Sequence, residues 1–589
     1  MFKGHPKGLY ALALANTGER FGYYTMLAVF ALFLRENFGL EAGTAGAIYS
    51  TFLGLVYFMP LVGGILADKF GFGKMVTIGI SVMFAGYMLL SFPLGGDLLA
   101  MMAMMAALLL ISLGTGLFKG NLQVMVGNLY DDPKYADKRD SGFSLFYMAI
   151  NVGSLFAPTT AVGIKRWAET ALGFSSNDAY HFSFMVACAA LILSILIYYA
   201  FRRTFRHVEG GKKKGEAAQV VDNLTPAETK QRIIALCLVF AVVIFFWMAF
   251  HQNGLTLTYF ADEFTNTNAF GLQTMLFDVW NLALIIVAVY ATFSIFQSEG
   301  AKGKILSGAV GTAVLAILVY RAMGIEPTTE IAVAAPIFQQ FNPFYVVALT
   351  PVSMAIFGAL ARKGKEPSAP RKIAYGMLVA AIGFAVMAFG SQGLNTPNEQ
   401  ARAIAVNKAE LFANDCYTVA ANYDALTQAD GKANANIKAA QDFMGKLTEK
   451  TRPVFAEVYN AECTVLVNED AEAVAAAATT LEAVKANTRE TRTSPYWLIL
   501  TYLILTFAEL LLSPMGISFV SKVAPPKLKG LMMGGWFVAT AIGNMLVAVG
   551  GFLWAGLPLW SVWTVFIVLC LLSALFMFVM MKRLESVTK

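Results

Sequence analysis

The sequence predicts an all-helical membrane protein, and three observations support this fold class. Hydrophobic residues make up 57% of the 589 residues and charged residues only 14%, a balance that is unusual for soluble domains. Apolar stretches long enough to cross a bilayer recur along the chain. The connectors that fall on one side of the membrane are basic, which is typical of cytoplasmic loops. We therefore expect a multi-pass protein of the plasma membrane, or of the inner membrane in a bacterium.

Fourteen apolar stretches are each long enough to form a transmembrane helix. Six of them predict an N-terminal six-helix half within residues 1–201, at about 9–34, 43–66, 75–95, 98–128, 141–163 and 180–201. The other eight lie at about 231–260, 273–297, 303–321, 337–360, 371–390, 496–520, 530–553 and 560–582. Twelve form the expected core, and the pair at about 273–321 consists of extra helices between the seventh and eighth core helices.

Basic connectors give the expected orientation in the membrane. Residues 202–230 form a linker after the sixth stretch and contain the run RRTFRHVEGGKKKG. The positive-inside rule places this linker in the cytoplasm, and alternation of the helices then places both chain termini there too. The connectors at 297–304 and 361–372 fall on the same side and are also basic. The C-terminal half is accordingly expected in two parts, 231–390 and 496–589.

Residues 391–495 interrupt the C-terminal half with a soluble insertion on the extracytoplasmic side. This segment is rich in Ala, Asn, Glu and Lys and has no apolar stretch of membrane length. Its composition, including the run AEAVAAAATTLEAVKA, favours helices. Cys416 and Cys463 are its only cysteines, and the sequence leaves open whether they form a disulfide or remain free thiols. The insertion has no catalytic motif and is a possible contact surface for an extracytoplasmic partner.

The first predicted helix carries two charged residues at membrane depth. Glu19 and Arg20 lie within the run NTGERFGYY. At about 100° per residue, one polar face of this helix is shared by Asn16, Glu19, Arg20, Tyr23 and Tyr24. Each charge costs at least about 2.5–3.5 kcal/mol to insert, so such residues are usually paired and functional. A buried ion pair that only holds helices together is the alternative interpretation.

Two more charged residues lie inside later helices. Lys119 occupies a glycine-containing apolar stretch, where an ammonium group needs a carboxylate partner. Glu19 and Glu509 are the candidates for that partner. Glu509 also precedes Pro514 by about one turn, where a helix is expected to kink and free carbonyl groups.

Signatures of several other function classes are missing from the sequence. Gly114, Gly116 and Gly120 precede no Gly-Lys-Ser/Thr motif, so helix packing explains them better than phosphate binding. No basic and aromatic surface predicts nucleic-acid binding, and no motif predicts an enzyme or a metal site. We therefore expect a secondary transporter that contacts lipid and uses no cofactor. The sequence does not predict an oligomeric state.

Several stretches together resemble the proton-coupled oligopeptide transporter family of the major facilitator superfamily. The most specific are ERFGYY in the first helix and FYMAINVGSLFAP at 146–158. Others are GTGLFKGN, VYFMP, FFWMAFHQNG, FNPFY, AELLLSPMGISFVSKVAP and GGWF. The connector LADKFGFGK resembles the cytoplasmic loop motif of the superfamily. The resemblance covers the twelve core helices but neither the extra pair nor residues 391–495.

This resemblance implies a major facilitator fold, in which two six-helix halves surround a central cavity and access to it alternates. The positions that match the family's peptide site are Arg20, Tyr23, Tyr24, Tyr57, Asn151, Trp247, Asn342, Glu509 and Trp536. The residues implied in proton coupling are Glu19, Lys119, His251 and Glu509. Ordinary helix packing is the alternative role for the aromatic residues and the asparagines.

The sequence departs from the family pattern at three site positions. Asn16 replaces the first acidic residue of the pattern Glu-x-x-Glu-Arg, and Gly120 replaces the proline that usually follows the lysine. His251 occupies a position often held by an acidic residue. Because histidine titrates near neutral pH, His251 is a candidate protonation site, with a neutral hydrogen-bonded histidine as an equal alternative. Placement of the extra helices after the seventh core helix is a further departure.

The function that the resemblance implies is import of di- and tripeptides together with protons. Transport of another amphipathic organic solute, such as a modified amino acid or an exported metabolite, is the alternative. A receptor or scaffold that uses residues 391–495 is a third class, but it leaves the buried charges unexplained. We expect Lys119 to pair with Glu19 in one access state. We also expect the insertion to be dispensable for transport, because all charged cavity candidates lie outside it.

Overall fold

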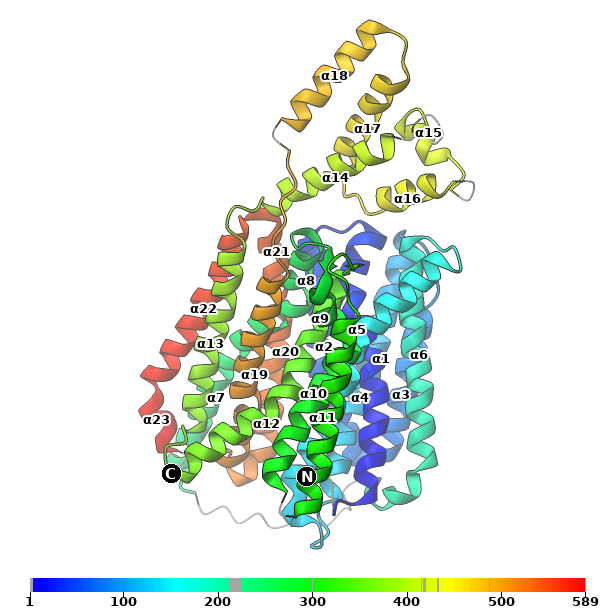
Figure 1. Ribbon diagram of the computed structural model, residues 1–589. Helices are drawn as coiled ribbons and strands as arrows, with labels where there is room; N and C mark the ends of the chain where they lie inside the picture. The colour runs from blue at the N-terminus through cyan, green and yellow to red at the C-terminus, as the bar shows by residue number, and fades with distance from the viewer. Residues whose placement is uncertain are drawn as a thin grey trace.

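The chain folds into a long helical bundle with a smaller helical insertion at one end (Figure 1). The computed structural model describes residues 4–210, 224–298, 300–414, 416, 420–431, 434–486 and 488–587. Within them, thirteen helices are long and apolar enough to cross a membrane. Helix α1 (Lys7–Phe38) is not among these, because Glu19, Arg20 and their polar neighbours lower its mean hydropathy, yet it runs along the bundle beside the others. The predicted all-helical membrane fold is confirmed.

The N-terminal half contains α1 and five further long helices. They are α2 (Ala42–Phe70), α3 (Phe72–Leu90), α4 (Leu98–Asn128), α5 (Arg139–Thr170) and α6 (Ser176–Ala200). Helix α1 packs on α5 and α6, while α2 and α3 pack on α4. The predicted packing role of the glycines is confirmed for Gly114 and Gly116. A Cβ atom at Gly63 would lie 2.1 Å from the Gly116 carbonyl oxygen, and one at Gly79 would lie 2.7 Å from that of Gly114.

The C-terminal half contains six spans, two of which are broken. Its helices are α7 (Pro226–Phe250), α8 (Thr256–Glu263), α12 (Phe341–Arg362), α13 (Ala369–Gly390), α19 (Tyr496–Val523), α20 (Lys529–Met545), α21 (Ala548–Gly556), α22 (Leu559–Val579) and α23 (Met581–Ser586). Among the described residues, the 3₁₀ helices are η1 (Ala136–Lys138), η2 (Arg202–Thr204), η3 (Arg206–Val208), η4 (His251–Gly254), η5 (Gly271–Gln273), η6 (Ala335–Gln340) and η7 (Pro526–Leu528).

The two breaks face each other, which the apolar stretches at 231–260 and 530–553 did not reveal. One break is η4, between α7 and α8, and the other lies between α20 and α21. The Gln252 side-chain amide donates to the Met248 and Val547 carbonyl oxygens, at 3.1 Å each. A buried side chain thus satisfies carbonyl groups that the interrupted helices leave free, as membrane depth requires.

The two extra helices form a hairpin on the outside of the core, between α7 and α12 in the chain as predicted. Helix α10 (Val279–Gln297) packs on α5, α12 and α11 (Ala301–Met323), and the short α9 (Thr274–Phe277) precedes it. Strands β1 (Asn268–Phe270) and β2 (Glu330–Ala332) pair antiparallel where the hairpin joins the core. Asp278 caps α10 and forms an ion pair with Arg321 at 2.5 Å.

Residues 391–495 fold into a separate helical body with its own apolar core. Its helices are α14 (Pro397–Ala413), α15 (Tyr423–Gln428), α16 (Ala435–Met444), α17 (Arg452–Val467) and α18 (Ala471–Lys485), as the composition predicted. The body sits at one end of the bundle, and the start of α1 and helix α23 lie at the opposite end (Figure 1). We call these the insertion end and the termini end.

The disulfide that the sequence allowed between Cys416 and Cys463 is not formed. Both cysteines are free thiols, and both are buried in the apolar core of the insertion. The Cys463 sulfur instead lies 3.8 Å from the Ala420 carbonyl oxygen. Burial, with a further contribution from neighbouring Cys416, raises the pKa of the Cys463 thiol to about 12. The pair therefore packs as protonated, small apolar side chains.

Candidate substrate and proton-coupling site

A cavity of about 280 Å³ lies between the two halves. Helices α1, α2, α4 and α5 line it from the N-terminal half, and α7, η4, η6, α12, α19 and α20 line it from the C-terminal half. The predicted site residues at its wall are Arg20, Tyr23, Tyr24, Tyr57, Lys119, Asn151, Trp247, His251, Asn342, Glu509 and Trp536. Glu19 is the one predicted residue that does not line it. Residues far apart in the sequence are thus brought to a single site.

Glu19 and Arg20 form a buried ion pair with each other. Arg20 Nε and Nη2 each lie 2.5 Å from a different carboxylate oxygen of Glu19, and the two side chains are 2% and 0% exposed. The guanidinium also lies over the Tyr23 ring, 4.5 Å from its centroid. Two of the five N–H donors of Arg20 are therefore already used in this pair. Removing one partner of such a pair typically costs about 3–5 kcal/mol.

Lys119 has neither of the carboxylate partners that the sequence suggested. Its ammonium group lies over the Tyr57 ring, 4.1 Å from the centroid. No ion pair of Lys119 with Glu19, Glu509 or another carboxylate occurs among the described residues. A cation–π contact compensates part of the charge's desolvation but leaves its donors available. The structure therefore presents an ammonium group that faces the cavity and is ready to meet an anion.

Glu509 is held by neutral donors from two different helices. The Asn342 amide donates to one carboxylate oxygen at 3.0 Å, and the Tyr147 hydroxyl donates to the other at 3.4 Å. Asn342 belongs to the C-terminal half and Tyr147 to the N-terminal half, so Glu509 takes part in a contact between the halves. Its side chain is largely buried and has no cation beside it among the described residues.

The aromatic residues form two groups at the wall of the cavity. The His251 ring stacks on Trp247 with centroids 5.1 Å apart and lies 6.0 Å from the Tyr57 ring. Trp536 is 3% exposed and contacts the backbone of α19 at Gly516, where a Cβ atom would lie 2.0 Å from the indole. These contacts place aromatic rings of both halves at the wall of the cavity. No carboxylate bonds to His251 among the described residues.

We predict that His251 contributes to the pH dependence of transport. Replacement by glutamine should retain uptake but flatten its pH profile between about pH 5 and 8, where an imidazole changes charge. Initial rates of peptide uptake across that range would test this prediction. His207→Gln, which changes an exposed histidine at the termini end, is the matched control. A profile that superimposes on the wild type would leave His251 as a packing residue.

Sequence reasoning missed several cavity residues, among them Tyr147 and Gln339. Tyr147 lies in the signature stretch at 146–158, but its sequence position alone did not predict a role in the site. Gln339 donates to the Ala28 carbonyl oxygen and to the Thr258 hydroxyl, at 3.0 Å each, and so joins α1 to the C-terminal half. Its position just before FNPFY, as a polar residue in an apolar stretch, was the available signal.

Comparison with known proteins places the chain in a family. A family model described as the POT family matches residues 73–227, 312–443 and 471–551. The chain belongs to the POT family. Its relatives include the peptide transporter YePEPT of Yersinia enterocolitica, 25% identical with 100% of this chain and 97% of the relative covered. An uncharacterized transporter of Bacillus subtilis, YclF, is 30% identical over 67% of this chain and 77% of its own length.

Other relatives and solved structures of the POT family agree with this assignment. Dipeptide and tripeptide permease B of Salmonella typhimurium is 27% identical over 67% of this chain and 75% of its own length. A POT family transporter solved in complex with 5-aminolevulinic acid superimposes with a TM-score of 0.64 at 18% identity, covering 100% of this chain and 98% of that one. The fold is therefore that of the family, a major facilitator bundle with twelve core helices and two extra ones.

Proposed function

We propose that this POT family member imports di- and tripeptides together with protons by alternating access. The family is one of transporters, and its named relatives include peptide transporters and dipeptide and tripeptide permeases. A secondary transporter of this fold binds its substrate between two halves that rock about the site. Small peptides and protons are then the two solutes that must both reach the central cavity.

The observation that carries the proposal is the separation of charge across the cavity. Arg20 and Lys119 lie on the N-terminal half, whereas Glu509 lies on the C-terminal half. Every small peptide has a carboxylate at one end and an ammonium group at the other, whatever its side chains are. A site with cations on one wall and a carboxylate on the other is complementary to those two ends and tolerates varied residues between them.

Protons are the proposed coupling ion, and no other cofactor is proposed. Glu509 is the carboxylate best placed to take up a proton, since its oxygens accept only neutral donors. Protonation of Glu509 would also remove a buried charge before the site closes on a substrate. Glu19 is a second candidate, because its ion pair with Arg20 can be broken only if its charge is neutralised or replaced.

The same proposal includes an orientation in the plasma membrane, or in the inner membrane of a bacterium. The basic connectors after α10 and α12 and the start of α1 lie at the termini end. The positive-inside rule then assigns that end to the cytoplasm and the insertion end to the opposite side.

Reconstituted vesicles test the proposed function. Uptake of a labelled dipeptide would be measured with and without an imposed pH gradient, in competition with other peptides, single amino acids and modified amino acids. We expect the gradient to drive accumulation and only di- and tripeptides to compete strongly. If only a non-peptide solute competed strongly, that solute class, and not peptides, would be the substrate. Binding without any uptake would favour a receptor.

A further inference from the structure

The insertion is fixed to the C-terminal half, from which it emerges. The Gln400 amide donates to the Glu263 carbonyl oxygen at 2.8 Å, and Arg492 donates to the Thr265 carbonyl oxygen at 2.8 Å. Thr493 adds two backbone hydrogen bonds next to them, to Phe264 at 2.7 Å and from Asn266 at 3.0 Å. These bonds join both ends of the insertion to the end of α8. We therefore expect the insertion to move together with the C-terminal half.

The same insertion also reaches across to the N-terminal half through three lysines. Lys446 pairs with Glu36 of α1 at 2.9 Å, and Lys450 lies 3.5 Å from Glu41, the residue before α2. Lys438 donates to the Gly173 carbonyl oxygen, between α5 and α6, at 2.7 Å. All three lysines fall in residues 438–450. We call this segment the lysine edge.

The contacts of the lysine edge differ in strength. The Lys450 and Glu41 side chains are 65% and 42% exposed, and such pairs contribute little. Those of Lys446 and Glu36 are 31% and 14% exposed, and Glu36 also accepts from the Tyr180 hydroxyl at 2.9 Å. Burial alone would lower the pKa of Lys446, but the charge of Glu36 raises it above its ordinary value, so Lys446 remains charged throughout the physiological range.

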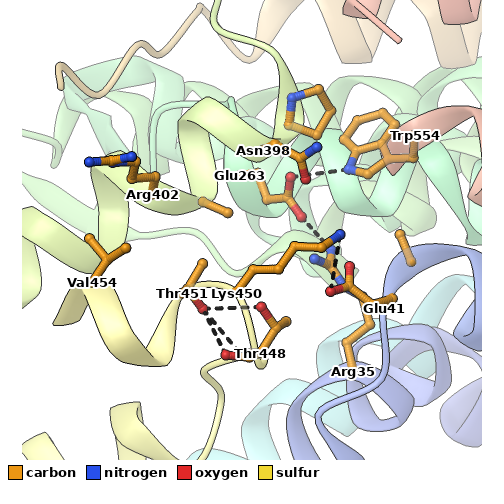
Figure 2. A pocket seen from close by; sticks show the side chains of 13 residues that line it. Arg35, Glu41, Glu263, Asn398, Arg402, Thr448, Lys450, Thr451, Val454 and Trp554 are labelled. Carbon is orange, nitrogen blue, oxygen red and sulfur yellow. Dashed lines mark hydrogen bonds and ion pairs between the residues drawn. The ribbon is translucent and has the colours of Figure 1, made fainter. Parts of the chain in front are cut away.

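Beneath the insertion, the two halves are already in contact. Arg35 of α1 forms an ion pair with Glu263 of α8, and the Trp554 indole donates to Glu263 at 3.1 Å. Figure 2 shows these side chains and Lys450 beside Glu41 around a cavity of about 180 Å³. The structure therefore has the insertion end closed, with the insertion spanning the seam between the halves.

We propose that the insertion is a latch that stabilises the conformation closed at the insertion end. Alternating access, which our proposed function requires, separates the halves at this end for part of each cycle. Because the insertion stays with the C-terminal half, opening must pull the lysine edge away from Glu36, Glu41 and Gly173. Contacts made only in the closed conformation shift the equilibrium toward it by their own free energy.

Distances across the insertion end test the latch without any substrate. Spin labels would be placed at Leu94, between α3 and α4, and at Trp560, in the first turn of α22, both exposed. The labels would be introduced into a variant in which all five native cysteines are replaced, after its peptide uptake has been verified. The variant Lys446→Gln/Lys450→Gln removes both ion pairs. Lys485→Gln is the matched control, since among the described residues Lys485 forms ion pairs with Glu410 and Glu462, both inside the insertion.

We expect the double variant to lower the ratio of short to long distances by about fivefold, the size of effect that one partly buried and one exposed pair can produce. Lys485→Gln should match the wild type. Salt at 1 M, where the Debye length is about 3 Å, should shift the wild type toward the double variant. The exchange Glu36→Lys/Lys446→Glu should restore part of the closed population.

Replacement of residues 391–495 by a short linker provides a second, independent test of the latch. The folded deletion protein should still take up peptide, because the cavity residues lie outside the insertion, but should show the open distance more often than the double variant does. Unchanged distance distributions in both the double variant and the deletion protein would overturn the latch. That result would leave the proposed transport function untouched, because the distances are measured without substrate.

Discussion

Lys119→Ala is expected to abolish proton-driven accumulation of peptide while leaving exchange of peptide across the membrane measurable. Lys119 is the one cavity cation without an ion pair among the described residues, and it rests on the Tyr57 ring. Its ammonium group can therefore meet Glu19, Glu509 or a substrate carboxylate as the halves move. Without it, Arg20 is the cation left at the cavity among the described residues, and Arg20 is already paired with Glu19. Accumulation should fall by at least about tenfold, the change that about 1.4 kcal/mol produces.

Vesicles with an imposed pH gradient would measure accumulation, and counterflow without a gradient would measure exchange. Lys119→Arg tests whether positive charge suffices, and Lys134→Ala, at an exposed lysine near the termini end, is the control for purification and insertion. Loss of counterflow as well would mean that Lys119 is needed for binding itself. Normal accumulation by Lys119→Ala would refute its coupling role.

The positions of the helices and of the site residues could be predicted because polar and charged residues are costly, and therefore rare, at membrane depth. A charged residue such as Lys119 within an apolar stretch is costly, so it must face a protein interior or a cavity. The same reasoning placed Arg20 and Glu509 correctly at one cavity. The core helices could be predicted from the lengths of the apolar stretches. The breaks at η4 and before α21 could not, because the hydrogen bond that joins them runs from Gln252 to Val547, nearly 300 residues away in the sequence.

The partners of the charged residues could not be predicted. Glu19 had two cations within reach in the sequence argument, and only geometry decides that it pairs with its neighbour Arg20 and leaves Lys119 on Tyr57. The sequence did not indicate the contacts of the lysine edge, because lysines of a soluble segment usually face water. Cys416 and Cys463 likewise share a compartment, but a shared compartment does not decide whether two cysteines are joined or remain free thiols, as they are here.

The largest effect on binding is expected from blocking the ends of the peptide. If cations of the N-terminal half bind the carboxylate and Glu509 binds the ammonium group, the substrate bridges the two halves and favours closure around itself. The structure adds a condition for Arg20. Two of its five N–H donors are held by Glu19, so a substrate carboxylate must either replace Glu19 or bind the remaining Arg20 donors together with Lys119. A peptide without its carboxylate gains neither contact: Arg20 stays paired with Glu19, and Lys119 meets no anion in the buried cavity.

A blocked end should therefore cost about 2–5 kcal/mol, which is at least about 30-fold in Kd. The experiment compares a dipeptide, its N-acetylated form and its C-terminal amide on the wild type, Arg20→Ala and Glu509→Ala. The C-terminal amide should bind the wild type weakly, and Arg20→Ala should reduce its affinity little further. The N-acetylated dipeptide should also bind the wild type weakly, and Glu509→Ala should reduce its affinity little further. If both blocked peptides bind the wild type as tightly as the free dipeptide, recognition of both ends is wrong. A different amphipathic solute then becomes the better candidate substrate.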